Sequence, residues 1–306
     1  MLDVRRLRLL RELSRRRTIA AVAEALSYTP SAVSQQLTIL EREAGVPLLH
    51  RTGRTVTLTP AAHRLVDHTE TILATLEQAT AELAATRTEL TGTLRIGAFP
   101  TAVRTILSPA LVMLSTAHPG LELLVSELDP ADAADALRSS ALDLALLQEY
   151  DYVPDEPESG LDTEPFLEET VHLAALNSKP IAAQADSSWI AGTPGTLCHR
   201  MTVRSCEAIG FTPRIRHHAD DFGTVLALAA AGQGVAFVPD LATHDVPPNV
   251  ILTPTNIHRR THLAYRRGTG AHPAVSAARQ ALRETVGRRN LTSGLLNHEP
   301  SVVNPI

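Results

Sequence analysis

The sequence predicts a chain of three parts: a small helical domain with a β-hairpin, one long helix, and an α/β domain of two lobes. Short segments with helically spaced apolar residues fill residues 3–45. Thr59-Pro60 is a helix-start signal, and no glycine or further proline interrupts the chain from there to Glu89. After Gly92, strand-like and helix-like segments alternate to about residue 286, which is typical of an α/β fold.

The composition is that of a globular protein. The 306 residues suffice for about two domains, and 44% hydrophobic with 20% charged residues excludes disordered, collagen-like and disulfide-stapled chains. Two cysteines, Cys198 and Cys206, cannot staple such a chain, and they fit a reducing compartment. The longest apolar run, residues 225–231, is far shorter than the roughly 20 residues that cross a bilayer. We therefore expect a cytoplasmic protein with no membrane partner.

Charge is divided unevenly along the chain. The net charge is −5, yet residues 1–60 hold ten arginines against five acidic residues, so the excess of acid lies in residues 61–306. A basic head on an acidic body predicts a polyanion bound by the head alone. Aromatic residues make up only 3%, which weakens the case for binding single-stranded nucleic acid by base stacking.

Residues 3–45 predict three short helices, the last two joined by a tight turn. Thr18 and Thr29 stand at N-cap positions, Pro30 follows at a first helical position, and Gly45 is a left-handed stop. Two helices joined in this way form a helix-turn-helix, in which the second helix lies in the major groove of DNA. The three helices are expected at residues 4–16, 19–26 and 30–43.

Residues 46–59 predict a hairpin after the third helix. Two strands are expected around Thr52-Gly53, and the hairpin carries Arg51 and Arg54. A hairpin in this place makes a wing, so residues 1–59 are expected to form an α-helical winged helix-turn-helix head.

The long helix, expected from Pro60 to about Glu89, carries an imperfect heptad repeat. Such a repeat predicts a coiled coil that joins two copies of the chain, and residues 60–90 are assigned to this linker. The alternative is one amphipathic helix packed on its own domain. The two heptad positions hold Leu65, Ile72, Ala79 and Thr86, and Thr69, Leu76, Leu83 and Leu90.

Residues 91–290 are expected to form the α/β domain, with mostly parallel sheets. An acidic stretch, residues 151–165, is expected to separate two lobes. The first lobe is assigned residues 91–164 and 267–290, the second residues 165–266, and residues 291–306 are expected to be a flexible tail. Strands are expected at about 93–99, 121–127, 143–148, 171–176, 188–191, 214–218, 235–238 and 262–266; helices at 103–117, 131–140, 197–209, 222–231 and 273–286.

Head, hairpin, long helix and α/β domain together resemble a LysR-type transcriptional regulator over nearly the whole chain. The phrase from Thr18 to Pro60, TIAAVAEALSYTPSAVSQQLTILEREAGVPLLHRTGRTVTLTP, is close to the family's winged helix-turn-helix signature, and DFGTVLALAAAGQGVAFVP, residues 221–239, is similar to an element of its second effector lobe. The resemblance implies a homodimer or homotetramer that binds operator DNA and contacts RNA polymerase. It also implies a periplasmic-binding-protein-like effector domain whose lobes clasp a small molecule.

Candidate DNA-reading residues lie on the third helix and the wing. Serine and glutamine carry donors and acceptors that can read base edges, so Ser34 and Gln35 are the first candidates. Many LysR-type relatives have Ser-Gln-Pro where this chain has Thr29-Pro30-Ser31, so no relative's operator preference is transferred. The alternative is that these are ordinary surface polar residues. The full candidate set is Thr29 as the cap, Ser31, Ser34, Gln35 and Gln36 as base or phosphate contacts, and Arg51 and Arg54 as phosphate or minor-groove contacts.

Candidate effector-binding residues follow strands of the α/β domain. Ligands of open α/β sheets bind beyond the carboxyl ends of strands, where helices begin and their N-termini attract anions. Three such junctions and one facing strand end predict a cleft for a small effector of anionic character. Ordinary caps and turns are the alternative at each position. The candidates are Pro100, Thr101, Ala102, Gln148, Thr193, Pro194, Phe222, Gly223 and Thr224.

Two other classes of protein share a two-lobed body: enzymes and solute-binding proteins without a DNA role. Cys198 and His199 are adjacent, and on a helix such neighbours point about 100° apart, so they cannot act as nucleophile and base. His258 and His262 fall in a segment that we expect to be extended, where they lie about 13 Å apart and cannot share a metal. We therefore expect no catalytic residue, metal or cofactor. The basic head argues against a transport role.

Overall fold

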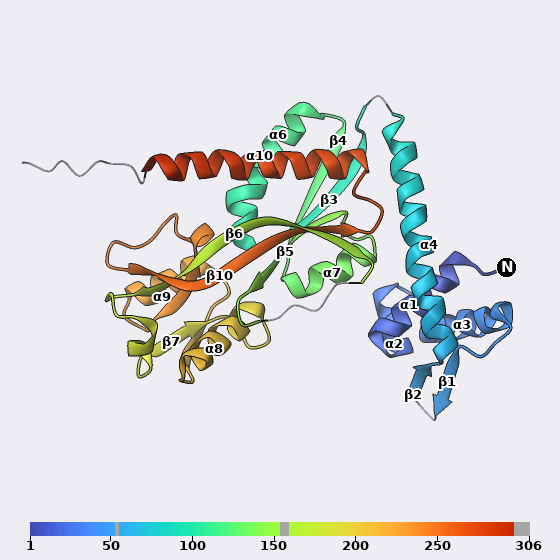
Figure 1. Cartoon of the computed structure of the whole chain (residues 1–306), viewed down its shortest axis with the longest axis horizontal. Coiled ribbons are helices and arrows are strands. Elements are labelled where there is room, and N and C mark those ends of the chain that lie inside the picture. The colour runs from blue at the N-terminus through green and yellow to red at the C-terminus, as the bar shows by residue number, and fades with distance from the viewer. Residues whose placement is uncertain (53–54, 88, 154–158, 297–306) are drawn as a thin grey trace, which may run out of the picture. The chain divides into compact units, whose positions relative to one another are not determined.

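The computed structural model describes residues 1–52, 55–87, 89–153 and 159–296 (Figure 1). The chain divides into two compact units. The first holds Met1–Thr86 together with Arg266–His272, and the second holds Arg87–Tyr265 and the chain from Pro273 onward.

Three helices build the head: α1 (Val4–Arg16), α2 (Ile19–Ala25) and α3 (Pro30–Ala44). The predicted caps are confirmed, because the hydroxyl oxygens of Thr18 and Thr29 each accept a backbone N–H three residues ahead. Gly45 ends α3 in the left-handed conformation, with φ of 68°. The core consists of one stripe from each helix with the hairpin, including Leu7, Leu10, Leu13, Val22, Val33, Leu37, Leu40 and Leu48.

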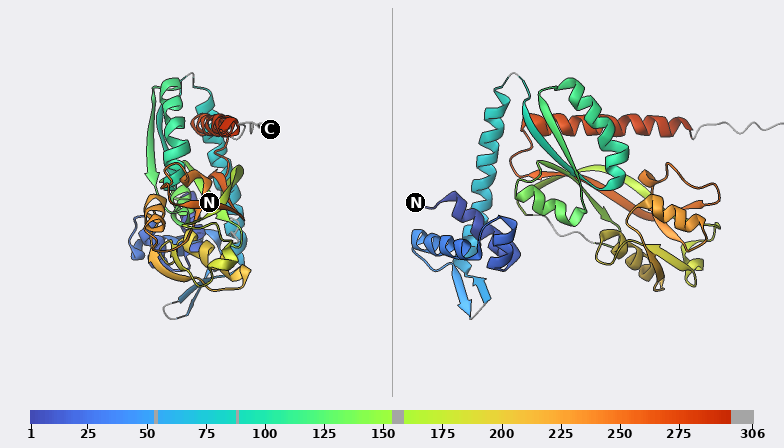
Figure 2. Two further views of the ribbon diagram at one scale, coloured as in Figure 1. Left: turned by 90° about the vertical axis from the view of Figure 1, so that its left-hand side faces the viewer. Right: turned by 180° about the vertical axis from the view of Figure 1, so that it is seen from behind.

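The predicted hairpin is present. β1 (Leu49–Thr52) and β2 (Thr55–Leu58) pair antiparallel, with Leu49 opposite Leu58 (Figure 2). The hydroxyl of Thr59 donates to the carbonyl of Pro47 and accepts the N–H of Ala62, so one side chain ties the hairpin to the next helix.

The long helix α4 covers Pro60–Ala85 and ends before the predicted residue Glu89. Thr86 is its C-cap, and the Thr86 hydroxyl donates to the carbonyl of Leu83. A threonine that bonds to the backbone in this way competes with the helical hydrogen bonds, which explains the earlier end. Leu90, the last predicted heptad residue, therefore lies outside the helix.

A six-stranded sheet forms the centre of the second unit, in the order β4-β3-β5-β10-β6-β9. β3 runs parallel to β4 and β5, but β5 with β10 and β6 with β9 are antiparallel. The prediction of mostly parallel sheets is thus wrong for this sheet. The strands are β3 (Gly92–Ala98), β4 (Leu121–Glu127), β5 (Leu144–Tyr150), β6 (Leu161–Ala175), β9 (Ala236–Pro239) and β10 (Ile251–Arg266).

β6 and β10 are much longer than predicted, and they belong to both lobes. β6 pairs with β9 only through Val171–Ala174, while β10 pairs with β5 through Arg259–Ala264. The chain therefore passes between the lobes inside these two strands, and it returns near Arg259 rather than after Arg266. The error has a physical reason: the crossing segments carry polar residues on both faces, so only their apolar ends have a strand-like pattern.

Helices cover both faces of the first lobe's sheet. In β5, Leu144 and Leu146 pack with α6 and α10, while Ala145 and Leu147 pack with α7, as strand alternation requires. Figure 1 shows α6 and α10 on one side and α7 on the other. The bounds are α5 (Pro100–Ala102), a π-helical turn (Val103–Leu107), α6 (Ser108–Ala117), α7 (Pro130–Arg138) and α10 (Pro273–Leu296).

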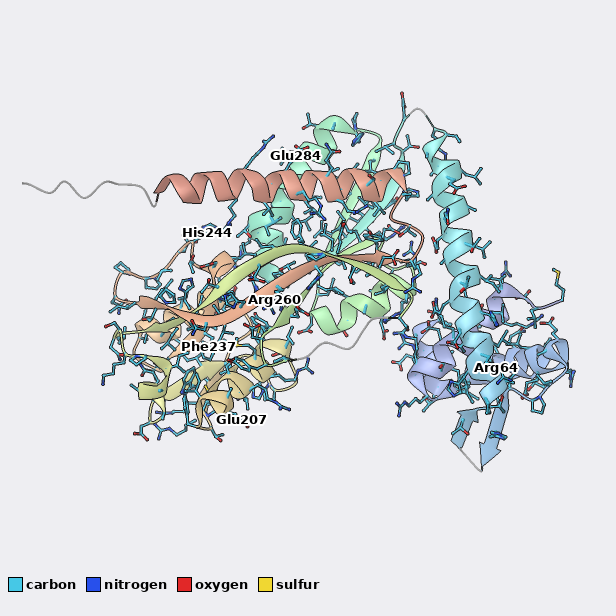
Figure 3. All side chains as sticks on the ribbon, viewed as in Figure 1. Arg64, Glu207, Phe237, His244, Arg260 and Glu284 are labelled. Atoms are coloured by element: carbon cyan, nitrogen blue, oxygen red, sulfur yellow. The ribbon has the colours of Figure 1, made fainter. Side chains whose placement is uncertain are left out.

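The second lobe adds a small parallel sheet of β7 (Ser188–Ala191) and β8 (Arg214–His218), with α8 (Leu197–Ile209) and α9 (Phe222–Ala230). Trp189 is fully buried and lies against Phe211 and Phe237, the last of which is labelled in Figure 3. Aromatic side chains thus join the small sheet to β9 and to the loop after α8.

α10 continues to Leu296, so residues 291–296, predicted to lie in the tail, are helical. Once a helix is nucleated, each added residue gains one backbone hydrogen bond. The helix can therefore extend into a segment of low helix propensity. The remaining predicted tail lies outside the described residues. Within the described residues, no helix is both long and apolar enough to cross a membrane.

Candidate functional site

One face of α3 is polar and open to solvent. Ser31 and Gln35 are exposed and Ser34 is half-buried, while Val33 and Leu37 on the opposite face lie in the head's core. The helical period separates these two sets, so the packing that fixes the helix also presents the polar face. The Thr29 cap supports the first turn, and its hydroxyl lies 3.0 Å from that of Ser31.

Gln36, also predicted to contact DNA, is held by a residue that sequence reasoning missed. Arg6 of α1 donates through Nε to Oε1 of Gln36 at 2.8 Å, and its guanidinium also pairs with Glu43. Since Arg6 donates to the amide oxygen, the NH₂ group of Gln36 keeps its two hydrogens as donors.

The wing carries the two arginines that were predicted to contact DNA. Arg51 is in β1, with its backbone opposite Val56. Arg54 lies outside the described residues. A further residue at this surface is Tyr28, which immediately precedes the Thr29 cap and is 48% exposed. The sequence could have indicated Tyr28, because an aromatic residue stands in the turn of the helix-turn-helix.

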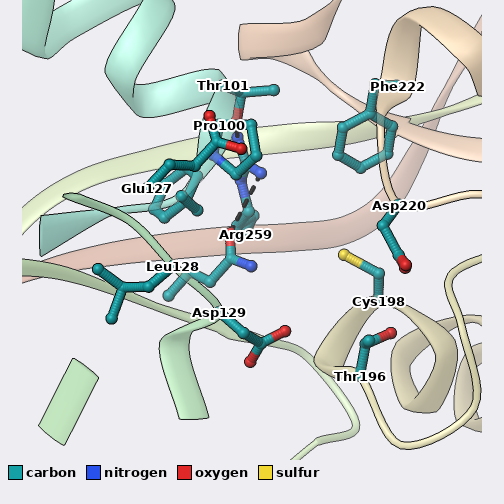
Figure 4. A pocket seen from close by; sticks show the side chains of 12 residues that line it. Pro100, Thr101, Glu127, Leu128, Asp129, Thr196, Cys198, Asp220, Phe222 and Arg259 are labelled. Carbon is teal, nitrogen blue, oxygen red and sulfur yellow. Dashed lines mark hydrogen bonds between the residues drawn. The ribbon is translucent and has the colours of Figure 1, made fainter. Parts of the chain in front are cut away.

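A cavity of about 350 Å³ lies between the two lobes of the second unit (Figure 4). Its walls come from the predicted kind of junction: residues after β3, after β4, and at the starts of α8 and α9. β5 and β10 supply its floor. The lining residues are Phe99, Pro100, Thr101, Glu127, Leu128, Asp129, Gln148, Thr196, Cys198, Asp220, Phe222 and Arg259.

The structure brings together four of the nine candidate effector residues: Pro100, Thr101, Gln148 and Phe222. The others have different positions. Ala102 is fully buried, and Pro194 is exposed outside this lining. Thr193 donates to Asp220, and Thr224 donates to Asp221 as part of the α9 cap. Gly223 lines a separate cavity together with Arg104 and Arg289.

Arg259 is the main lining residue that sequence reasoning missed. Its side chain is 1% exposed and lies over the Phe99 ring, with its guanidinium carbon 4.7 Å from the ring centroid. Nη1 donates to Oε1 of Gln148 at 3.2 Å, Nη2 donates to Oγ1 of Thr101 at 3.1 Å, and Nε pairs with Glu169. Burial by itself lowers the pKa of Arg259, but the neighbouring Tyr150 and Glu169 raise it, so the guanidinium stays charged.

Cys198 lines the cavity without a base beside it. Its sulfur lies 3.7 Å from the hydroxyl of Tyr150, and burial raises the pKa of both groups, which keeps them protonated near neutral pH. His199 follows it on α8 as predicted, and the His199 ring instead lies against that of His218, with centroids 6.0 Å apart.

His258 and His262 lie on β10, as expected for an extended segment, and each has a carboxylate neighbour. His258 is 3.1 Å from Asp151, and His262 is 3.4 Å from Glu149. No group of three or more His, Cys, Asp or Glu side chains in the described part of the chain is arranged to hold a metal ion.

A winged helix-turn-helix head, a long helix and a two-lobed domain with a cavity between its lobes define the class of ligand-responsive DNA-binding regulators. Residues 4–63 match the family described as bacterial regulatory helix-turn-helix protein, lysR family, and residues 87–287 match the LysR substrate binding domain. The chain belongs to the LysR family of transcriptional regulators.

Curated relatives span most of the chain. The transcriptional dual regulator GltC of Bacillus subtilis is 27% identical over 256 residues, which cover 81% of this chain and 84% of GltC. A probable hydrogen peroxide-inducible genes activator of Streptomyces viridosporus is 30% identical over 243 residues, covering 75% of this chain and 78% of the relative. Both are named as regulators of transcription.

Solved structures show the same fold. A mutant of Corynebacterium glutamicum OxyR has a TM-score of 0.58 at 23% identity, covering 98% of this chain and 96% of OxyR. CbnR, a LysR family transcriptional regulator, has a TM-score of 0.51 at 19% identity, covering 92% of this chain and all of CbnR.

Proposed function

We propose that this LysR-type regulator binds double-stranded operator DNA through α3 and the wing, and that a small molecule in the interlobe cavity controls this binding or the activation of transcription. The observation that carries the proposal is the polar face of α3, held outward by the packing of Val33 and Leu37. A relative in fold, CbnR, has been solved in complex with its target DNA.

Individual residues have separate roles in this proposal. Ser34 and Gln35 read base edges in the major groove, and Ser31 and Gln36 contact bases or phosphates. Thr29 supports the helix by about 1 kcal/mol as its cap and acts indirectly. Arg51 and Arg54 contact phosphates or the minor groove without strong base preference.

The assembly follows from α4. An apolar stripe of the helix is uncovered in the single chain, with Ile72, Leu76 and Leu83 exposed by 38%, 45% and 71%. We propose that two copies pack along this stripe, in a dimer or a pair of dimers. The two heads then contact half-sites about one helical turn, or a multiple of it, apart. RNA polymerase is the further partner if the bound regulator activates transcription.

The switch rests on the cavity's position between lobes. A ligand that binds one arrangement of the lobes better than another shifts the population toward it, and only that difference in affinity changes DNA binding. β6 and β10 are the connections that such a change passes through. If a saturating effector alters neither footprint nor affinity, it is not the controlling ligand.

We also propose that the cavity binds its ligand without converting it. The support is chemical: burial raises the pKa of the Cys198 thiol beside Tyr150, and the His199 ring lies near that of His218. Incubating the protein with a bound ligand and following the ligand by NMR tests this, because any product formed at a rate proportional to protein contradicts it.

Footprinting tests the DNA role. The full-length protein is expected to protect a site upstream of its own gene at moderate salt. Gln35→Ala is expected to lower discrimination at one base position by about 1–3 kcal/mol, because a base-edge contact is lost. Arg54→Ala is expected to weaken all sites alike and to reduce the salt dependence by about one phosphate.

The control is Gln280→Ala, which removes an exposed glutamine of α10 in the other unit and leaves DNA binding unchanged. A protein without preference among duplex sequences contradicts the function. Equal discrimination by Gln35→Ala at every position contradicts only the assignment of Gln35.

A further inference from the structure

A cavity of about 300 Å³, the head cavity, lies in the first unit beside the polar face of α3. Ala32 and Gln36 line it from α3. Each stands one position after an exposed residue of the polar face, Ser31 or Gln35, so the head cavity lies on the adjoining flank of the helix. The start of α1 and the turn before α3 supply the other walls. The lining includes Asp3, Arg5, Arg6, Tyr28, Ala32 and Gln36.

The amide of Gln36 is fixed with its oxygen toward Arg6. Nε of Arg6 donates to Oε1 of Gln36 at 2.8 Å, and the same guanidinium is anchored by an ion pair with Glu43. A guanidinium offers only donors, so this contact decides which end of the amide is the oxygen. Nε2 of Gln36 has no hydrogen-bond partner among the described residues, and both of its hydrogens remain for a ligand.

Two further donors line the head cavity. Arg5 is exposed, and its guanidinium makes no ion pair or hydrogen bond with the described part of the chain. Tyr28 is 48% exposed, and its hydroxyl likewise has no protein partner within the described ranges. Arg5, Tyr28 and Gln36 come from α1, the turn and α3, so three separate segments bring donors to one cavity.

The charges around the head cavity favour an anion. The charge of Arg6 is balanced by Glu43. Asp3 is the N-cap of α1, and its Oδ1 accepts the backbone N–H groups of Arg5 and Arg6, so the positive end of the helix offsets part of its charge. The guanidinium of Arg5 is then the cation that has no carboxylate bound to it.

A helix that lies in the major groove brings its flanks close to the DNA backbone. With side chains an α-helix is about 10–12 Å across, and the groove is about 12 Å wide. When the polar face of α3 points to the bases, the adjoining flank with the head cavity therefore lies near the phosphates of one strand. Arginine, glutamine and tyrosine are all common donors to such phosphates.

We infer that the head cavity holds one phosphate group of the DNA backbone, with Arg5, Tyr28 and Gln36 as its donors. The inference rests on the proposed DNA-binding function, and it deepens that function by giving Gln36 a phosphate contact in place of a base contact. Such a contact fixes the position of α3 in the groove and carries no direct sequence information.

Affinity for two duplexes separates a phosphate contact from a base contact. One duplex carries the site that the full-length protein protects in footprinting, and the other has a scrambled sequence of the same length. Tyr28→Phe removes one hydroxyl, and Gln36→Glu replaces the N–H donors with a carboxylate oxygen. Each variant is expected to weaken binding to both duplexes by the same factor, about threefold to tenfold. A loss confined to the protected site in Gln36→Glu shows a base contact and overturns the inference.

The charge of Arg5 has its own measurement. Arg5→Ala is expected to weaken both duplexes and to reduce the salt dependence of binding by about one phosphate per head. Arg204→Ala, which removes an exposed arginine of α8 in the other unit, is the matched control and is expected to keep the wild-type affinity and salt dependence. Arg5 and Tyr28 are exposed, so both variants are expected to keep the wild-type melting temperature.

Neutral methylphosphonates, placed one at a time in the protected site, then locate the contact. One position in each half-site is expected to weaken the wild type about tenfold and to affect Arg5→Ala much less, because both changes remove the same interaction. Equal losses for the two proteins at every position overturn the inference. A preference for the protected site that persists with full affinity in all three variants overturns only the phosphate site. Absence of any preference between the duplexes contradicts the proposed function itself.

Discussion

Arg259 and Arg260 are neighbours on β10 with opposite environments. Strand alternation turns Arg259 inward, where it is 1% exposed and paired with Glu169, and turns Arg260 outward, where it pairs with the exposed Glu168. The same two residue types thus form a buried pair and a surface pair one position apart. The two pairs are expected to differ greatly in what they contribute to stability.

Removal of the inner partner, in Glu169→Ala, is expected to lower the free energy of unfolding by about 3 kcal/mol or more. Arg259 then keeps a buried charge without its carboxylate, and the N–H of Leu241 loses its acceptor. Glu168→Ala, the control, is expected to change stability by less than about 0.5 kcal/mol. Urea unfolding of both variants measures the difference in the free energy of unfolding. If Glu169→Ala and Glu168→Ala lower it equally, the buried pair contributes no more to stability than the surface pair.

Helix α8 carries both cysteines of the chain, Cys198 and Cys206. They are eight positions apart, which corresponds to about 12 Å along a helix, whereas a disulfide needs Cα atoms within about 7 Å. Burial raises the pKa of Cys206 to about 12 and also raises that of Cys198. The helix therefore keeps both thiols apart and protonated.

Some relatives are named hydrogen peroxide-inducible activators, yet we expect peroxide not to act on this chain through its thiols. Thiolate is the reactive form, and α8 disfavours it. After exposure to stoichiometric peroxide, alkylation and mass spectrometry are expected to find both thiols reduced, and the double variant C198S/C206S is expected to keep the wild-type footprint. A disulfide between the two thiols contradicts this.

Helix α10 is tied to β6 by charge. Arg279 donates through Nη2 to Glu164 at 2.7 Å, and Arg283 pairs with the same carboxylate at 3.0 Å. The hydrogen bond from Arg279 holds the pKa of Glu164 below its ordinary value of 4.5. The link therefore stabilises the fold above about pH 4.5 and is lost as the pH falls through the lowered pKa of the folded state.

Glu164→Gln is expected to flatten the fall in melting temperature below about pH 4.5, because the variant has no carboxyl to protonate there. It is also expected to be less stable than the wild type at pH 7. Scanning fluorimetry across this pH range measures both effects. Glu284→Gln, on the exposed face of α10, is the control, and an identical slope in Glu164→Gln and wild type shows that the link does not contribute.

At the scale of the whole molecule, the uncovered stripe on α4 implies a second copy. Burying an exposed leucine or isoleucine is worth about 1.5–3 kcal/mol, so Leu76→Asp is expected to weaken the assembly at least tenfold. Light scattering at micromolar concentration is expected to show a smaller species for this variant. Gln78→Asp, an exposed change on another face of the helix, is the control. An unchanged mass for Leu76→Asp contradicts assembly through this stripe.

Local signals predicted the head well. Thr18, Thr29 and Gly45 act on backbone groups within a few residues of themselves, so their effect does not depend on the rest of the fold. Long strands were predicted poorly. The crossing parts of β6 and β10 are polar, and only pairing with distant strands makes them extended.

The sequence by itself determined the three-part order of the chain, the winged head and the outward face of α3, because caps, stops and apolar spacing specify local geometry directly. Only the tertiary structure decided the make-up of the cavity. Arg259 lies 111 positions after Gln148 and 158 after Thr101, and the pairing of β5 with β10 brings it beside Gln148. The contacts of Arg259 with these two residues decide which of their polar atoms are hydrogen-bonded within the protein. A local sequence pattern cannot predict this, because the donor lies on a distant strand.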